Sequence, residues 1–508
     1  MIATVHTVAL IGFDGALVEV ETDLKQGLPA MHIVGMGNKA VEEARERVRS
    51  ALTNSLLDFP TRKLIVNLAP AELPKDGAHF DLPIALSVLI ASGQLQQSQV
   101  EKAVFAGELS LSGELRPIRG VITIVEAAQK AGYAQIFVPI NNLSQAQLIN
   151  GIESIGVTDL SSLYLHLKGE VLIHPSPPNH AGEPVAGHIT SSTSHSIDAI
   201  YGQGAAKRAL QIAAAGRHNL LLCGPPGSGK TMLARALLDL LPPLSQQESL
   251  AVTKIHSIAG ELEKVITERP FRSPHHTTSA LALIGGGAKP RPGEISLAHH
   301  GVLFLDELPE YSRASLESLR QPIEDRSISI ARMHGRTTYP ADFMLIATMN
   351  PCPCGYYGDT QKECQCTTTQ IQTYQKRLSG PLLDRIDLVL TVSKVDHHQL
   401  LTTNMLHKKQ HNTVVEAIAQ AVKHQQNRYN SSDIYNASLS SVDVKTKLTI
   451  SSAARALLGT ASDHLHLTTR SYFKVIKVAQ TIADLDSRPT IESSDIAEAL
   501  QYRISAPS

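Results

Sequence analysis

The sequence lacks a strong net charge and any long hydrophobic run, and each absence excludes a class of protein. Its 46 Lys and Arg residues nearly balance 47 Asp and Glu residues, which leaves a formal net charge of −1. No field would therefore draw the whole molecule onto nucleic acid or an anionic membrane, and polyanion binding must come from local patches. No apolar run reaches the roughly 18 residues that a membrane-spanning helix requires.

The amino terminus and the few cysteines favour the cytoplasm. The opening segment, MIATVHTVALIGFDGALVEV, lacks a basic region and carries Asp14 and Glu19, which is untypical of a signal peptide. The five cysteines would stay reduced in that compartment, which disfavours disulfides. We therefore expect a cytoplasmic protein without a membrane partner.

The 508-residue chain is too long for one hydrophobic core, and its composition divides it. Residues 171–196 are rich in Pro, Gly, Ser, Thr and His, which is typical of a linker. Residues 1–170 alternate strand-like and helical runs, an α/β pattern, and residues 197–395 repeat it. Residues 396–508 have helical spacing with few strand signals, which predicts a helical lid or bundle.

The strongest signal is NLLLCGPPGSGKTMLARALLDLL, in which an apolar strand leads through a glycine-rich loop into an amphipathic helix. The glycines let backbone N–H groups point at phosphate oxygens, Lys230 would reach the β and γ phosphates, and the Thr231 hydroxyl would hold Mg²⁺. This context predicts nucleotide binding. The predicted nucleotide-binding residues are Gly224, Pro225, Pro226, Gly227, Ser228, Gly229, Lys230 and Thr231.

A second apolar strand, in HHGVLFLDELPEY, ends in two acidic residues. Asp306 suits the Mg²⁺ shell, usually through water, and Glu307 is placed to orient and deprotonate an attacking water. The alternative is a buried strand that merely ends in solvated acids, which is common for isolated DE pairs. Downstream of a P-loop, the pair instead predicts hydrolysis of the bound nucleotide rather than binding alone.

Two further residues are candidates for contact with the γ-phosphate. FMLIATMN is typical of a buried strand whose end places Asn350, where a neutral amide could hold the lytic water. The alternative is a turn-forming Asn before Pro351. Arg385, in LSGPLLDRIDL, stands between two acids and is either part of a structural salt bridge or an arginine finger for a neighbouring subunit.

Together, GPPGSGKT, GVLFLDEL, ATMNPCPCG and LSGPLLDRIDL resemble the AAA+ ATPases, and within them the ComM/YifB family of the magnesium-chelatase-like branch. The resemblance covers nearly the whole chain. It implies a homo-hexameric ring with ATP and Mg²⁺ at each interface. It also implies that Asn350 is sensor 1, Arg385 the finger in trans, and Arg470, on the lid, sensor 2. Without the family, Arg470 would be an ordinary solvated residue on a helix.

This branch resembles the minichromosome-maintenance helicases in two insertions that face a pore. Residues 273–296 fall where a helix-2 insert would lie, and residues 328–343 are typical of a hairpin before sensor 1. A ring would present their basic residues six times around a central strand of DNA. The alternative for each residue is an ordinary solvated loop charge. The candidate contacts are Arg332, Arg336, Lys289 and Arg291.

The amino-terminal domain resembles the Lon-protease-like fold, also known as the ribosomal S5 domain 2-like fold. NLAPAELPKDGAHFDLPIAL and AGELSLSGELRPIRGVITIVEAAQKAG are similar to the segments that carry the Ser/Lys dyad of Lon. His79 falls near the serine position and Ile122 near the lysine position. Neither residue can perform the chemistry of the dyad, so we expect a non-peptidase module for assembly or substrate engagement.

Four of the five cysteines lie in NPCPCGYYGDTQKECQC, residues 350–366. Because Glu307 would activate water, no thiol nucleophile is needed. Four thiolates suit tetrahedral Zn²⁺, although the one-residue gaps are shorter than the usual two to four. The open alternatives are a structural zinc site and a Pro/Gly-fixed turn with free thiols. The pattern C-x-C…C-x-C consists of Cys352, Cys354, Cys364 and Cys366.

Three functions are open at this stage. The family resemblance implies a DNA helicase that promotes branch migration in recombination or natural transformation, with recombination proteins as possible partners. A magnesium-chelatase ATPase subunit is the second, against which stand the Lon-like domain and the missing integrin-type domain. A protein-remodelling ATPase is the third, suggested by the Lon-like domain. We expect the DNA motor.

Overall fold

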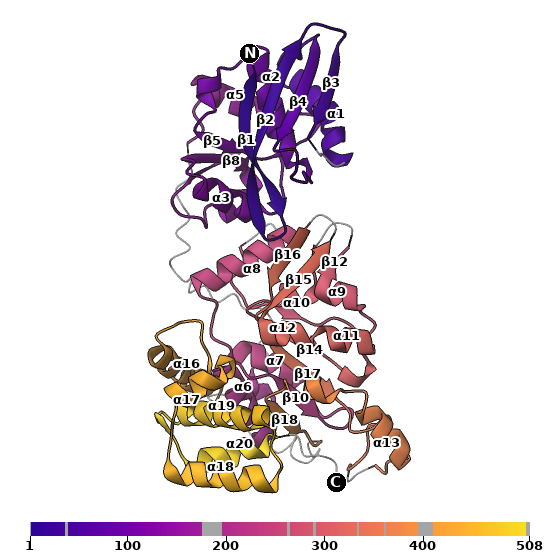
Figure 1. The fold of residues 1–508 in the computed structure, drawn as a ribbon, viewed down its shortest axis with the longest axis vertical. Coiled ribbons are helices and arrows are strands. Elements are labelled where there is room, and N and C mark those ends of the chain that lie inside the picture. Colours follow the sequence, from indigo (N-terminus) through magenta and orange to yellow (C-terminus); the bar gives the residue numbers. More distant parts are fainter. Residues whose placement is uncertain are drawn as a thin grey trace.

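The structure is a computed structural model that describes residues 2–35, 39–174, 196–261, 265–287, 291–332, 335–359, 362–394 and 410–503. An amino-terminal α/β domain stands on a second α/β domain, and a helical domain packs beside the second (Figure 1). Within those ranges, no helix combines the length and the apolarity needed to cross a membrane.

The amino-terminal domain is built on a mixed seven-stranded sheet in the order β3-β4-β2-β1-β5-β8-β9. β1 pairs antiparallel with β2 on one side and parallel with β5 on the other. A separate pair joins β6 and β7. The strands are β1 (Ala3–Ile11), β2 (Asp14–Lys25), β3 (Ala30–Val34), β4 (Lys63–Ala69), β5 (Ala103–Phe105), β6 (Glu108–Leu109), β7 (Leu115–Arg116), β8 (Gln135–Pro139) and β9 (Glu153–Val157).

Helices cover both faces of this sheet. Side chains alternate between the two faces along each strand, so apolar residues of one strand pack against helices on either side. Val5 of β1 packs in one hydrophobic cluster with Leu86, whereas Val8 packs in another with Ile124. The helices are α1 (Lys39–Asn54), α2 (Asp81–Ala91), α3 (Val121–Lys130), α4 (Leu143–Ala146) and α5 (Leu160–Lys168).

The second domain carries a five-stranded parallel sheet in the order β11-β14-β17-β10-β18. In its centre, Leu220 of β10 lies between Ile346 of β17 and Leu388 of β18. Parallel strands covered on both faces are apolar throughout, which explains the unbroken runs LLL, VLFL and MLIATM. The strands are β10 (Leu220–Cys223), β11 (Phe271–Arg272), β14 (Val302–Leu305), β17 (Met344–Met349) and β18 (Leu388–Thr391).

Most helices of the second domain lie in the connections between the strands of this sheet. α8 begins with a capping box, in which Ser245 accepts a hydrogen bond from the Glu248 N–H and the Glu248 side chain accepts one from Ser245. The helices are α6 (Gly204–Gly216), α7 (Lys230–Leu240), α8 (Gln246–Ala259), α11 (Arg313–Ser318), α12 (Arg320–Asp325), α13 (Thr368–Gln375) and α14 (Gly380–Leu383).

Two insertions project from the second domain. One lies between β11 and β14, and the other is an antiparallel hairpin in which Ser327 pairs with Pro340 and Arg332 with Gly335. Leu283 of the first insertion and Ile328 of the hairpin share one hydrophobic cluster. The elements are α9 (Ala280–Ile284), β12 (Gly285–Gly286), β13 (Arg291–Pro292), α10 (Glu294–Leu297), β15 (Ser327–Arg332) and β16 (Gly335–Pro340).

The helical domain shares a hydrophobic cluster with α6 and α7, so the two units are packed as one body. A buried hydrogen bond of 2.8 Å between His218 Nε2 and Thr481 Oγ1 also joins them. The elements are α16 (Gln410–Tyr429), α17 (Ser441–Lys447), α18 (Ser452–His464), α19 (Thr469–Leu485) and α20 (Ser493–Gln501), with a short parallel pair of β19 (Thr449–Ile450) and β20 (Thr490–Ile491).

The amino-terminal domain rests on α8 and on the hairpin of β15 and β16 (Figure 1). Lys254 of α8 forms a 2.5 Å ion pair with Glu126 and lies 4.1 Å from the centre of the Phe13 ring. Gly12 approaches the hairpin so closely that a Cβ there would lie 2.0 Å from Thr337 Cγ2. The turn between β1 and β2 is therefore seated directly on β16.

Candidate active site

The glycine-rich loop joins β10 to α7 at the carboxyl edge of the parallel sheet. Gly224 leaves no room for a side chain, because a Cβ there would lie 2.2 Å from the carbonyl oxygen of Val392. Gly229 has a φ of 83°, a left-handed conformation that favours glycine, and α7 begins directly after it. The free N–H groups of the first turn of α7 therefore face the loop, as anion binding requires.

Lys230 is held by neutral acceptors. Its Nζ donates hydrogen bonds to the carbonyl oxygens of Gly224 at 2.7 Å and Pro225 at 3.0 Å, and to Asn350 Oδ1 at 3.2 Å. Burial lowers the pKa of Lys230, opposed by nearby Cys223 and the two acids of β14. An ammonium so placed gains from an anionic partner, and phosphate oxygens fit that need.

The two acids follow β14, and Thr348 of β17 fixes both. The Thr348 hydroxyl donates to Asp306 Oδ1 at 2.5 Å and accepts a hydrogen bond from the Glu307 N–H at 3.0 Å. Glu307 has a φ of 52°, an uncommon conformation for a residue other than glycine, and its side chain is exposed. The carboxylate is therefore presented to solvent at the edge of the sheet.

Thr348 is the site residue that the sequence analysis missed. It lies two positions before Asn350, and residues two apart on a strand point to the same face. That alternation is the signal by which it could have been found.

Asn350 completes a first cluster. It follows β17, which lies between β10 and β14, so its amide stands between the P-loop and the acids. Thr231, on the first turn of α7, is exposed at the same edge. The structure thus brings together, at the carboxyl ends of three neighbouring strands, Lys230, Thr231, Asp306, Glu307 and Asn350.

Arg385 lies at the opposite edge of the sheet. Asn219, directly before β10, donates its Nδ2 hydrogen to the carbonyl oxygen of Arg385 at 3.0 Å. Arg385 itself precedes β18, which is parallel to β10. The four residues of β10 span about 13 Å, so Lys230 and Arg385 are separated by the length of the strand.

Arg470 joins Arg385 rather than the P-loop. The Arg385 guanidinium lies 2.8 Å from Glu324 Oε2, and the Arg470 guanidinium pairs with the other oxygen of Glu324. Both arginines therefore belong to a second cluster, where α12, α19 and the segment before β18 meet.

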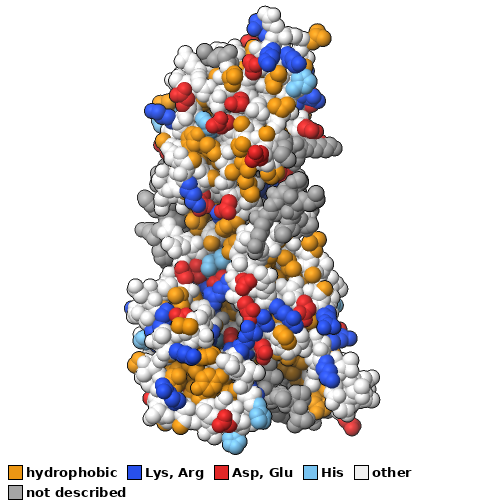
Figure 2. All heavy atoms as spheres, viewed as in Figure 1, with side chains coloured by type: hydrophobic (Ala, Val, Ile, Leu, Met, Phe, Trp, Pro, Cys, Tyr) orange, Lys and Arg blue, Asp and Glu red, His pale blue; other side chains and the backbone are white. Residues whose placement is uncertain are grey.

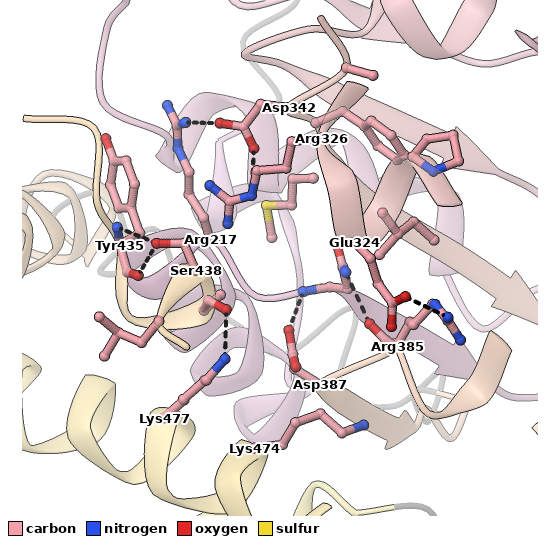
Figure 3. Close-up of a pocket in the computed structure, with 18 of the residues that line it drawn as sticks. Arg217, Glu324, Arg326, Asp342, Arg385, Asp387, Tyr435, Ser438, Lys474 and Lys477 are labelled. Carbon is pink, nitrogen blue, oxygen red and sulfur yellow. Dashed lines mark hydrogen bonds and ion pairs between the residues drawn. The ribbon is translucent and has the colours of Figure 1, made fainter. Parts of the chain in front are cut away.

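A cavity of about 270 Å³ adjoins this second cluster, and Figure 3 shows its lining. Lys474 Nζ donates to the carbonyl oxygen of Ile386 at 2.6 Å and Lys477 Nζ to that of Ala437 at 3.2 Å. Burial lowers the pKa of both lysines. Their spacing from Arg470 places all three on one face of α19.

Charged side chains of both signs crowd the groove between the helical domain and the second domain (Figure 2). The cavity itself has more cationic than anionic groups, which makes it suited to an anion. Its cationic residues are Arg217, Arg326, Arg385, Arg470, Lys474 and Lys477, and its carboxylates are Glu324, Asp342, Asp384 and Asp387.

The structure describes the four predicted DNA-contacting residues only in part. Arg291 is exposed on β13. Arg332 and Arg336 lie near the turn of the hairpin, on β15 and β16, and their side chains fall outside the description. Lys289 lies outside the described residues.

In the amino-terminal domain, His79 and Ile122 are both buried. His79 Nε2 lies 2.9 Å from the carbonyl oxygen of Val8, and burial lowers the pKa of His79 to about 4. Ile122 is fully buried in the cluster around α3. Neither side chain offers a nucleophile or a base to solvent.

Comparisons with known proteins cover almost the whole chain. The family model described as "Magnesium chelatase, subunit ChlI" matches residues 196–400, "Subunit ChlI of Mg-chelatase" matches residues 20–142, and "Magnesium chelatase, subunit ChlI C-terminal" matches residues 408–503.

Among individual proteins, the chain is 40% identical to "Uncharacterized protein YifB" of Escherichia coli over 99% of this chain and 97% of that protein. It is 40% identical to "Competence protein ComM" of Haemophilus influenzae over the same shares. The "Magnesium-chelatase 67 kDa subunit" of Heliobacterium mobile is 29% identical, over 32% of this chain and 29% of that subunit.

Proposed function

The chain belongs to the ComM/YifB family of magnesium-chelatase-like AAA+ ATPases, and from this premise we propose that it is a ring-shaped motor that hydrolyses ATP to act on DNA. The proposed activity is a helicase that promotes branch migration in recombination or natural transformation. The kinship with a protein named for competence supports this direction.

One observation carries the proposal: the two clusters lie at opposite edges of one sheet. Within one chain, β10 separates Arg385 from Lys230 by about 13 Å, and the Arg385 guanidinium is paired with Glu324, so contact of both residues with one ATP is best met by two neighbouring subunits. Head-to-tail contacts of this kind form a ring when the rotation between neighbours closes, and we propose a ring of six copies, as the family resemblance implies. Arg470, which shares Glu324 with Arg385, would then also act on the neighbour's nucleotide.

In the proposed reaction, the N–H groups of the P-loop and Lys230 bind the phosphates. The oxygen donors of Thr231 and Asp306 fit Mg²⁺, which would neutralise charge on the phosphates. Glu307 accepts a proton from water as the water oxygen attacks the γ-phosphorus and the bond to ADP breaks. Asn350 orients that water, and the neighbour's Arg385 and Arg470 stabilise the charge that develops.

The hairpin provides the link from ATP to DNA. Ile330 of β15 shares a hydrophobic cluster with Leu305 of β14 and Ala347 of β17, the strands that carry Glu307 and Asn350. A shift at the nucleotide is therefore passed to the hairpin through packed side chains. We propose that Arg332 and Arg336 of the hairpin, with Lys289 and Arg291 of the first insertion, contact DNA phosphates in the pore.

We assign the helical domain the role of a lid and the amino-terminal domain that of a Lon-like module without peptidase activity. The buried positions of His79 and Ile122 support the second assignment. Because Gly12 touches Thr337, the module is seated to sense or limit movement of the hairpin.

A magnesium-chelatase ATPase subunit is the second candidate, favoured by the names of the matching family models. The heliobacterial subunit is similar over only about a third of the chain. Insertion of Mg²⁺ into protoporphyrin with partner subunits would test this candidate.

The main proposal is tested by ATP turnover and by unwinding of forked and four-way DNA. We expect branched DNA to stimulate turnover, ATP to drive unwinding, and Lys230→Ala to abolish both. The Arg332→Ala/Arg336→Ala variant should keep basal turnover and lose the stimulation. Arg455→Ala, an exposed arginine of α18, is the matched control and should behave as wild type. Active ATPase without DNA stimulation or unwinding would reject the DNA motor.

A further inference from the structure

The four cysteines that follow Asn350 converge on one point. The Sγ of Cys352 lies 3.4 Å from that of Cys354 and 3.6 Å from that of Cys364, and the Cys354 and Cys364 sulfurs are also 3.6 Å apart. With Cys366 included, all four sulfurs lie within 4.8 Å of one another.

At these spacings the sulfurs are not joined as disulfides, and their arrangement fits a metal. A disulfide requires about 2.05 Å between sulfurs. Four thiolates at about 2.3 Å from a tetrahedral Zn²⁺ lie about 3.8 Å from one another. The observed distances are close to the tetrahedral value, so the short C-x-C gaps do not prevent the four sulfurs from meeting.

Backbone donors point at the same sulfurs. The Tyr357 N–H donates to Cys352 Sγ at 3.3 Å, and Tyr356 supplies a backbone hydrogen bond to Cys354. Such N–H groups stabilise the ionised thiolates that a metal requires. Cys352 is fully buried, so the centre is shielded on that side.

The loop that carries the cysteines packs closely against the P-loop. Gly355 has a φ of 84°, and a Cβ there would lie 2.6 Å from Pro226 Cδ and 3.9 Å from Asn350 Cγ. The backbone of Gly355 is therefore in direct contact with the phosphate-binding loop and next to the sensor residue.

Two further contacts tie the same loop to its surroundings. Gln375 of α13 donates its Nε2 hydrogen to the carbonyl oxygen of Pro351 at 3.2 Å. Asp359 forms a 2.7 Å ion pair with Lys394, just after β18. The loop thus spans the P-loop, α13 and the end of β18.

We propose that Cys352, Cys354, Cys364 and Cys366 bind one structural Zn²⁺, which fixes this loop as a brace against the P-loop. Four protein ligands complete the tetrahedron and leave no position for water or substrate, so the ion supports the fold and performs no chemistry. The soft thiolate set favours Zn²⁺ over Mg²⁺.

The metal is tested on the wild-type protein, prepared without chelators, by elemental analysis. We expect about one zinc per chain, released in step with titration of the thiols by a mercurial. Replacement by Co²⁺ should give the thiolate charge-transfer and d–d bands of a tetrahedral centre. Less than ~0.2 zinc per chain, or stoichiometric iron in its place, would overturn the assignment.

Two variants test the residues. Cys364→Ser/Cys366→Ser should lose the zinc, whereas Cys223→Ala, which removes the cysteine outside the cluster, should keep it. Retention of a full equivalent of zinc by the double variant would contradict the ligand set.

Gly355→Ala tests the contact of the loop with the P-loop separately from metal binding. It keeps all four thiolates, so we expect a full equivalent of zinc together with at least tenfold lower ATP turnover, since the new methyl group displaces Pro226. This part rests on the proposed ATPase, whereas the zinc content does not depend on it. Unchanged turnover in an otherwise active enzyme would reject the brace and leave the metal result standing.

Discussion

The Nζ of Lys230 lies 3.2 Å from the Oδ1 of Asn350, so a hydrogen bond from a charged ammonium to a neutral amide joins the P-loop to the end of β17. Lys230 supplies positive charge, and Asn350 supplies a neutral amide. In the proposed mechanism, phosphate oxygens that bind Lys230 would release the amide to hold water.

Asn350→Ala should therefore separate binding from hydrolysis. We expect ATP affinity to change by less than about threefold and turnover to fall by about 100-fold, since the loss is confined to orientation of the attacking water. Equilibrium binding of a fluorescent ATP analogue and a phosphate-release assay measure the two quantities. A parallel loss of affinity would place Asn350 on the phosphates.

Glu307→Gln should retain ATP binding and lose at least about 1,000-fold in turnover, because the amide cannot accept the proton of the attacking water. Thr348→Val leaves the Glu307 carboxylate but removes both hydrogen bonds that fix the acids. We expect an intermediate loss from this variant, measured in the same assay. Full activity of Glu307→Gln would remove the general base from the account.

Glu248 makes the second domain sensitive to acid. Burial would raise the pKa of Glu248, but Arg217, Arg269 and the Ser245 N–H outweigh it and lower the pKa to about 2. A carboxylate with a lowered folded pKa stabilises the protein above its unfolded pKa of about 4.5, and this stability is lost as the pH falls toward 2.

Glu248→Gln should accordingly destabilise the domain at pH 7 by about 2 kcal/mol, because Arg217 and Arg269 lose their charged partner. The difference from wild type should narrow as the pH falls from about 4.5 to about 2. Melting temperatures of both proteins across that range measure the effect. A difference that is independent of pH would contradict the ion-pair explanation.

The P-loop and the strands that directly precede Asp306 and Asn350 were predictable from sequence because each is a local pattern. An apolar run and the residue that follows it fix the edge of the sheet at which that residue lies. The parallel order of β10, β14 and β17 then brings the three ends together.

The grouping of Arg470 with Arg385 was not predictable. It depends on how α19 packs against α12, and Glu324, the residue they share, lies 146 positions from Arg470. No local pattern encodes such a tertiary contact. The left-handed conformation of Glu307 was likewise invisible, since nothing in VLFLDEL requires a positive φ.

Because Arg470 and Arg385 both form ion pairs with Glu324, replacement of Arg470 should have the same effect as replacement of Arg385. Arg470→Ala should bind ATP as wild type does in dilute, unassembled protein, and should lose most of its turnover under assembling conditions. ATP binding is measured at low protein concentration and ATP turnover at high protein concentration. If Arg470 instead contacted the nucleotide of its own chain, Arg470→Ala would lose ATP affinity at both concentrations.

The most direct test of a site shared between subunits is ATP turnover in mixtures of two inactive variants. Lys230→Ala lacks the proposed phosphate contact, and Arg385→Ala lacks the proposed finger. In equimolar mixed rings, about a quarter of the interfaces pair an intact P-loop with an intact finger, so we predict about a quarter of wild-type turnover from two proteins that are each inactive alone. Mixed rings, verified by native mass spectrometry, that remain as inactive as the separate variants would contradict the account.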